Sequence, residues 1–157
     1  MRDSMMAPLI GMPVSHVWRG YGSALCLECG ELRPTTKRDG SPGNPRGELS
    51  VLVEWSWRIE GRRSILCGSW SDERTWPRVF ALLRDTEVAD ASLFGRLPEI
   101  ELRLSNEVRF LSFMTAAGDP HWTVFDNRGD ATRWLCVRGG ALRIETESRG
   151  SAVVSAA

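Results

Sequence analysis

The spacing of apolar residues along this chain predicts a mainly β protein. Between Val51 and Ile59 every second residue is large and apolar, while most of the residues between them are polar or charged. Side chains alternate between the two faces of a β-strand, so this period predicts a strand whose buried face carries Trp55 and Trp57. Shorter runs of the same kind recur along the chain, separated by turn residues, as VSHVWR, ALCLEC, IELRL, HWTVFD and RWLCV.

Glycine and proline mark where these strands turn. Residues 20–22, with the sequence Gly-Tyr-Gly, predict a hairpin between the first two runs, and the Gly-Gly pair at 139–140 predicts another near the end of the chain. Residues 34–47, PTTKRDGSPGNPRG, form a loop by composition. The run VRFLSFMT at 108–115 is apolar on both faces, which indicates a central strand.

One segment has the spacing of an amphipathic helix. In SDERTWPRVFALLRD, residues 71–85, the apolar positions recur at i, i+3, i+4 and i+7 as Trp76, Val79, Phe80 and Leu83. Ser71 or Thr75 could cap its start. Its apolar stripe must pack against the strands on either side.

Together these elements predict a mainly β (α+β) fold, with an antiparallel sheet or sandwich of about eight strands and one packed helix. A chain of 157 residues is about the size of one domain. We therefore expect an N-terminal extension at 1–13, a single β-rich domain at 14–147 and a flexible C-terminal tail at 148–157.

Composition narrows the classes of function. The formal net charge is zero and no long basic run is present, so we expect no nucleic-acid partner. No segment has the apolar core of a secretory signal or the roughly 20 apolar residues of a membrane span, so we expect a cytoplasmic protein without membrane contact. Lys37 is the only lysine beside many arginines, which suggests a GC-rich bacterial genome.

Two groups of residues carry the types needed for metal binding or catalysis. Cys26 and Cys29 have the spacing of half a zinc site, but on a strand positions i and i+3 face opposite sides, which favours reduced, buried structural thiols. His121 with Asp119 or Asp126 has the residue types of an acid–base site, although both carboxylates also suit turns. No phosphate loop, nucleophile elbow or other cofactor motif is found, so we expect no cofactor.

The tryptophans permit two interpretations. Trp55 and Trp57 share a predicted face with aliphatic residues, and Trp76 begins the helix stripe, so most of these rings are expected in the core. The alternative is that Trp55, Trp57 and Trp76 line the pocket of a β domain that binds a small ligand.

The stretches GSALCLECGEL, VEWSWRIEG and PHWTVFD resemble small uncharacterised bacterial β-rich proteins, a group that includes candidate immunity proteins of toxin systems. The resemblance implies a binding role without catalysis. Our first hypothesis is therefore a non-enzymatic module that binds a protein partner, with a toxin-neutralising role as one version, or that self-associates as a homodimer. The small-ligand-binding domain and the enzyme that uses His121 are the alternatives.

Overall fold

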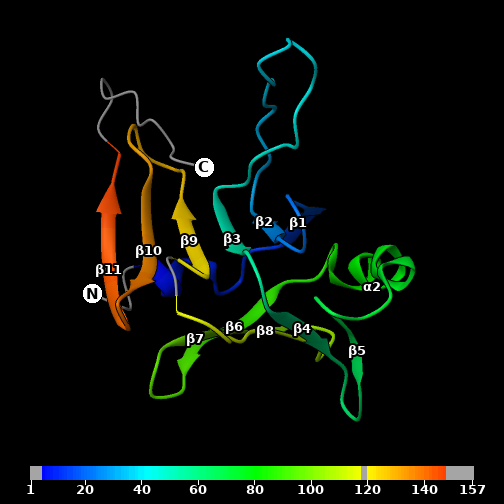
Figure 1. Ribbon diagram of the computed structural model, residues 1–157. Coiled ribbons are helices and arrows are strands. Elements are labelled where there is room, and N and C mark those ends of the chain that lie inside the picture. The colour runs from blue at the N-terminus through cyan, green and yellow to red at the C-terminus, as the bar shows by residue number, and fades with distance from the viewer. Residues whose placement is uncertain (1–4, 118–119, 148–157) are drawn as a thin grey trace.

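The computed structural model describes residues 5–117 and 120–147, which form eleven strands in two antiparallel sheets (Figure 1). The six-stranded sheet follows the order β1, β2, β3, β9, β10, β11, with the bounds Val14–Arg19, Leu25–Cys29, Leu49–Val53, Trp122–Asp126, Arg133–Arg138 and Ala141–Thr146. The five-stranded sheet follows the order β5, β4, β8, β7, β6, with the bounds Ile65–Gly68, Trp57–Glu60, Arg109–Ser112, Glu99–Leu104 and Val88–Phe94. The predicted fold class is confirmed, with more strands than expected.

The core lies between the inner faces of the two sheets. Val51, Val53 and Val124 face it from the six-stranded sheet, and Ile59 and Phe110 face it from the five-stranded one. All of these side chains are at most 1% exposed. Burying aliphatic and aromatic surface on this scale is the main source of stability for a sandwich. The run at 108–115 supplies β8, which is the central strand of its sheet as predicted.

The prediction of one continuous strand through Trp55 and Trp57 is wrong. β3 ends at Val53 in the six-stranded sheet, and β4 begins at Trp57 in the five-stranded sheet. The three residues between them carry the chain across, so the period of two is interrupted and Trp55 is 60% exposed. Both halves keep their apolar face toward the same core, which explains why the pattern looked uninterrupted.

The sequence pattern also missed β6. Its sequence, VADASLF, contains small and polar residues that lack a clear period of two, and it lies at the edge of the five-stranded sheet. Only Val88 of this strand is fully buried. An edge strand with one covered side carries a weak hydrophobic signal, so periodicity alone does not reveal it.

The predicted helix is present as α2 (Trp76–Leu83), preceded by the 3-10 turn η2 (Glu73–Thr75). All four residues of the predicted stripe are buried, and the helix contacts β1 and β5. The Trp76 ring lies 5.2 Å from the ring of Trp57 between centroids. The first turn is capped by Asp72, whose carboxylate accepts from the backbone N–H of Arg74 at 3.0 Å, rather than by Ser71 or Thr75.

The segment before Val14 joins the same core. It contains a second 3-10 turn, η1 (Ala7–Leu9), and the side chains of Met5 and Leu9 are fully buried. The tail expected at 148–157 lies outside the described residues. Within those residues, no helix combines the length and apolar character needed to cross a bilayer.

Candidate functional site

The outer face of the six-stranded sheet, opposite the core, carries an unusual set of side chains. Strand register places Glu28, Ser50, Phe125 and Trp134 in one row across four neighbouring strands. The next row begins with Trp18, Cys26 and Leu52 on three neighbouring strands. An outer sheet face is normally polar and solvated, so two tryptophans, a phenylalanine and a leucine together need an explanation.

These residues form the floor and walls of a groove with a volume of about 640 Å³. We call it the outer-face groove, and its volume lies within the range of small-molecule sites. Its lining residues are Trp18, Cys26, Glu28, Thr35, Thr36, Lys37, Gly43, Asn44, Arg46, Ser50, Leu52, Phe125, Asn127, Thr132, Trp134 and Glu147.

One wall of the groove is the connection between β2 and β3. Residues 31–47, here called the arm, project from the sheet as a long hairpin-like extension (Figure 1). Arg33 and Arg46 exchange backbone hydrogen bonds of 2.8 and 2.9 Å, and Gly43 donates to the carbonyl of Thr35 at 2.9 Å. The imidazole of His16 on β1 contacts the Asn44 side chain at 3.1 Å. The segment predicted as a loop is therefore held by its own backbone pairing and by a contact with the sheet.

A buried carboxylate organises the groove where the arm begins. Glu28 is 3% exposed, and its Oε1 accepts from the Trp18 indole N–H at 3.0 Å and from the Cys26 thiol at 3.3 Å. Its Oε2 accepts from the backbone N–H of Gly47 at 2.8 Å and from the Ser50 hydroxyl. Four donors match the acceptor capacity of a carboxylate, so this buried charge is fully satisfied.

The two tryptophans are fixed by similar bonds. The Trp18 indole N–H is held by Glu28, and the Trp134 indole N–H donates to Glu145 at 2.8 Å. Trp134 also packs against Phe125, with 6.2 Å between ring centroids. Because each N–H is occupied by a carboxylate within the protein, the rings can offer only their apolar surfaces to a bound molecule.

Charged side chains lie at the rim of the groove. Lys37 and Arg46 line it from the arm, and Glu147 lines it where β11 ends. The four donors that bond Glu28 are neutral and leave its negative charge in place, but Lys37 and Arg46 together give the arm side of the groove a net positive charge, and Glu147 makes the opposite side negative. This separation favours a ligand whose anionic end points toward the arm.

The structure does not gather Trp55, Trp57 and Trp76 around one pocket. Trp57 and Trp76 are each 2% exposed and pack against one another in the core, where the indole N–H groups bond to the carbonyls of Ser23 and Gly68. Trp55 lies on the strand crossover, exposed to solvent. The core interpretation therefore fits Trp57 and Trp76, while the groove is built from tryptophans that were not singled out.

Cys26 and Cys29 lie on opposite faces of β2. Cys29 belongs to the core, whereas Cys26 lines the groove, so the two thiols cannot share a metal ion. Burial raises the pKa of the Cys29 thiol to about 12, and burial together with the charge of Glu28 raises the pKa of Cys26 well above its ordinary value. Both remain protonated at neutral pH, which makes them poor nucleophiles. The part of the chain that the structure describes contains no cluster of three or more candidate metal ligands.

The predicted acid–base group is not assembled among the described residues. His121 is 7% exposed and lies just before β9, while Asp126 is the last residue of that strand, about 16 Å further along an extended chain. Asp126 is paired with Arg128, at 2.8 and 2.9 Å between carboxylate oxygens and guanidinium nitrogens, which lowers its pKa. Asp119 lies outside the described residues.

Sequence reasoning missed Trp18, Trp134 and Glu28 as site residues. One available signal was the charge of Glu28 within the otherwise apolar strand LCLEC, all of which is buried. A carboxylate at such a position needs several hydrogen-bond donors around it. Its presence in a buried strand therefore indicates an organised polar site. Comparisons with protein-family models, curated proteins and solved structures found no match to this chain.

Proposed function

We propose that this protein is a non-catalytic binding domain whose outer-face groove takes a small, flat, largely apolar organic anion. The observation that carries the proposal is the pair of tryptophans, Trp18 and Trp134, held by carboxylates in a groove of about 640 Å³. Rings held in advance lose little side-chain entropy when a ligand arrives, which favours binding. Lys37 and Arg46 would receive the anionic group.

The absence of an assembled acid–base pair among the described residues fits binding better than catalysis. The thiol in the groove is protonated, and Glu28, the buried carboxylate of the groove, already accepts four hydrogen bonds. A residue that already accepts four hydrogen bonds is poorly placed to take a proton from a substrate. The groove is therefore suited to holding a molecule unchanged.

Calorimetric titration with matched small molecules tests this proposal. Indole-3-acetate should bind more tightly than the neutral indole-3-acetamide, because only the acid carries the charge that the arm attracts. Trp134→Leu should weaken binding at least about tenfold, since it removes one apolar wall. Trp70→Leu is the matched control, because Trp70 is 84% exposed and lies outside the groove lining. If a broad panel of planar acids produces no heat, or if Trp134→Leu binds like the wild type, the proposal fails.

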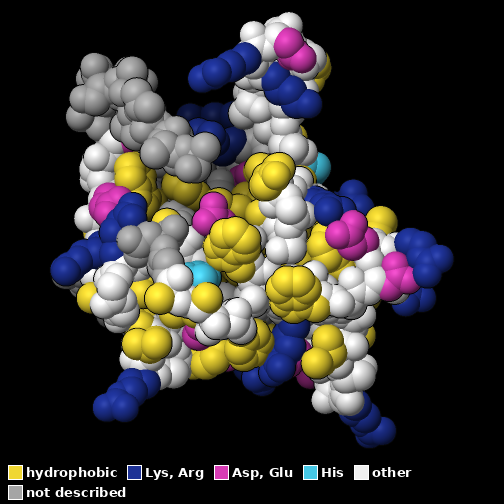
Figure 2. Space-filling view, viewed as in Figure 1, with side chains coloured by type: hydrophobic (Ala, Val, Ile, Leu, Met, Phe, Trp, Pro, Cys, Tyr) yellow, Lys and Arg dark blue, Asp and Glu magenta, His cyan; other side chains and the backbone are white. Residues whose placement is uncertain are grey.

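A second candidate is the protein-binding module expected from the sequence, supported by three exposed aromatic side chains on neighbouring segments, here called the aromatic cluster. Tyr21, Trp55 and Trp70 are 100%, 60% and 84% exposed, and Figure 2 shows large hydrophobic side chains on one face of the molecule. Tryptophan and tyrosine are enriched among the residues that dominate protein interfaces. Several large exposed rings carried by neighbouring segments are typical of a surface that binds a partner.

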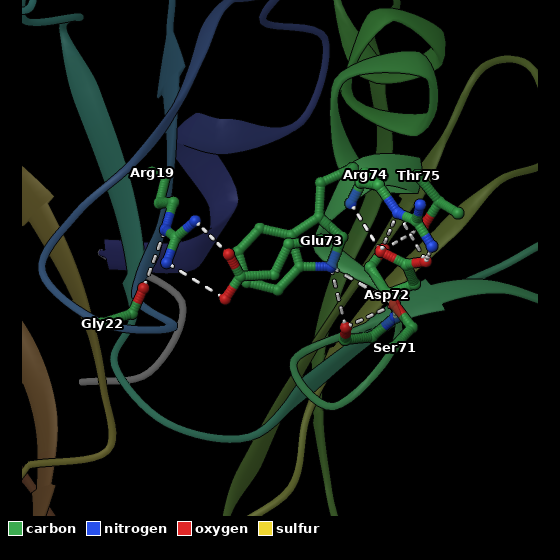
Figure 3. A network of polar contacts seen from close by, with 9 residues as sticks. Arg19, Gly22, Ser71, Asp72, Glu73, Arg74 and Thr75 are labelled. Carbon is green, nitrogen blue, oxygen red and sulfur yellow. Dashed lines mark hydrogen bonds and ion pairs between the residues drawn. The ribbon is translucent and has the colours of Figure 1, made fainter.

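Polar contacts hold the segments of this cluster together. The Ser23 hydroxyl in the β1–β2 turn donates to the carbonyl of Trp55 at 3.0 Å. Arg19 donates to the carbonyl of Gly22 in the same turn and pairs with Glu73 at 2.7 Å, which links the turn to the segment after Trp70 (Figure 3). The three rings are thus carried by connected segments.

Affinity capture from the native host tests the second candidate. A protein retained by the wild type and by Trp134→Leu, but lost with Trp55→Ser, would support binding through the aromatic cluster. The toxin-neutralising version further requires that the captured protein be a toxin inhibited by this chain. A partner retained equally by all three proteins would argue against the cluster.

A further inference from the structure

The last strand of the six-stranded sheet has a free edge among the described residues. β11 is bonded on one side to β10 in a regular register without a bulge, and no described strand pairs with its other side. The other sheet edges are protected differently. β1 and β6 each carry a register shift, and bonds from the backbone of Val14 and Val88 to neighbouring segments cover part of those edges. β5 is only four residues long. β11 is therefore the edge best suited to pairing.

The hairpin geometry identifies which backbone groups of β11 are free. Gly139 and Gly140 have φ values of 56° and 75°, the mirror-image turn that closes a two-residue hairpin. In such a hairpin the flanking residues form a hydrogen-bonded pair, and bonded pairs then alternate along the strands. Ala141, Arg143 and Glu145 consequently direct their N–H and C=O groups toward β10. Leu142, Ile144 and Thr146 direct theirs to the free edge.

This edge is self-complementary when two copies meet antiparallel with Ile144 on the two-fold axis. Ile144 then pairs with its own copy, and Leu142 pairs with Thr146, so that all three free residues become hydrogen-bonded pairs. On the outer face, the same register places Arg143 directly opposite Glu145 of the second copy, twice per dimer. Opposite charges at directly facing positions stabilise an antiparallel pair, whereas like charges destabilise it.

We propose that β11 is a homodimerisation edge, which joins the six-stranded sheets of two copies into one continuous antiparallel sheet. The occupant is a second copy of this chain, because the charge pattern of the edge complements itself in the one register that also satisfies the free backbone groups. This interface would adjoin the groove, because Glu147 lines the groove directly after β11, and it would bring Arg143 of the second copy beside Glu145, the residue that holds Trp134.

A charge-swap experiment with the full-length chain tests the register. Arg143→Glu places like charges opposite one another in a homodimer, and Glu145→Arg does the same with the opposite sign, so each variant alone should dimerise at least about tenfold more weakly. An equimolar mixture of the two restores both complementary pairs and should recover the dimer as a heterodimer. Arg63→Glu, an exposed turn residue of the other sheet, is the matched control and should dimerise like the wild type.

Thr146→Pro provides a second test that is independent of charge. Proline removes an N–H group that points to the free edge, so the fold should persist, with an unchanged far-ultraviolet circular dichroism spectrum, while dimerisation weakens. Sedimentation velocity over a hundredfold range of concentration measures each equilibrium. A wild-type monomer at every concentration, or a dimer that both Arg143→Glu and Thr146→Pro leave intact, would overturn the proposal. Recovery in the mixture together with loss in Thr146→Pro would support it.

Discussion

Replacing Glu28 by glutamine tests whether the buried carboxylate holds the groove and the base of the arm together. Glutamine keeps the size of the side chain but replaces one acceptor oxygen with an NH₂ group, which only donates. Each carboxylate oxygen of Glu28 accepts two hydrogen bonds. Whichever way the amide is turned, one pair of donors therefore faces another donor. The affected pair is either Trp18 with Cys26 or Gly47 with Ser50.

The size of the effect follows from these contacts. A buried N–H group that loses its acceptor costs about 1–3 kcal/mol, and the remaining bonds lose the strength that the negative charge gave them. Because Ser50 and Cys26 can rotate their hydrogens away, one N–H group is lost outright in each orientation. We expect the free energy of unfolding to fall by about 3 kcal/mol. For a domain of this length that corresponds to a decrease in Tm of about 6–12 °C.

Urea unfolding followed by circular dichroism measures this change, with Glu101→Gln as the matched control. Glu101 lies on β7 and forms an ion pair with Arg109 at 2.9 Å, in which the arginine side chain is 50% exposed. Because solvent screens a pair whose arginine is half-exposed, it contributes about 1 kcal/mol or less. A loss in Glu28→Gln no larger than the loss in Glu101→Gln would refute the claim that Glu28 is the organising residue of the groove.

Three further predictions concern the same sheet. Gly47→Ala should destabilise the fold by at least about 2 kcal/mol, because the new Cβ would lie 2.5 Å from the carbonyl oxygen of Cys29, whereas Gly129→Ala, with no neighbour closer than 3.6 Å, should be nearly neutral in urea unfolding. Asp126→Asn should lose stability at pH 7. The pKa of Asp126 is lowered by Arg128, so the stabilisation is present above the unfolded pKa of about 4 and is lost as the pH falls through the folded value, and the difference from the wild type should shrink in acid. Replacing residues 34–45 by Asn-Gly, which suits the hydrogen-bonded Arg33–Arg46 pair, should leave the fold intact but abolish ligand binding in calorimetry.

The inner faces of the two sheets could be predicted from the sequence because a single periodicity governs them. The alternation of buried and outward-facing residues continues from Val51 and Val53 to Ile59 even though the chain changes sheets between them. Both strands pack their apolar side chains into the same core. The crossover itself could not be predicted, because the alternation of apolar residues continues through it and no break in the pattern marks its position. The helix stripe of Trp76 and Phe80 was predictable because its period of 3.6 differs clearly from the period of two in the neighbouring segments.

The groove could not be predicted in the same way because its residues come from segments far apart in the sequence. Trp18 and Trp134 lie on strands separated by more than a hundred residues, and strand order, which no local pattern encodes, decides that they face the same groove. The arm was recognisable as a loop, but its composition does not indicate that it lines a groove beside the sheet. The pairing register between strands that are distant in the sequence cannot be predicted from a single sequence by local patterns.

The position of the arm and the burial of Glu28 depend on each other. On a bare outer face a glutamate would be solvated and would need no partners, and the apolar rings beside it would be exposed. The base of the arm, together with the neighbouring side chains, removes water from the carboxylate, which is costly unless donors replace the lost hydration. Those donors come from β1, β2, β3 and the point where the arm rejoins the sheet, so the charge fixes the position of the arm as well as the orientation of Trp18. A chain that needed only a closed core would be served equally well by a threonine at this position and a short turn. The combination of a long arm and a buried charge therefore supports the proposal that the groove is shaped in advance for a ligand.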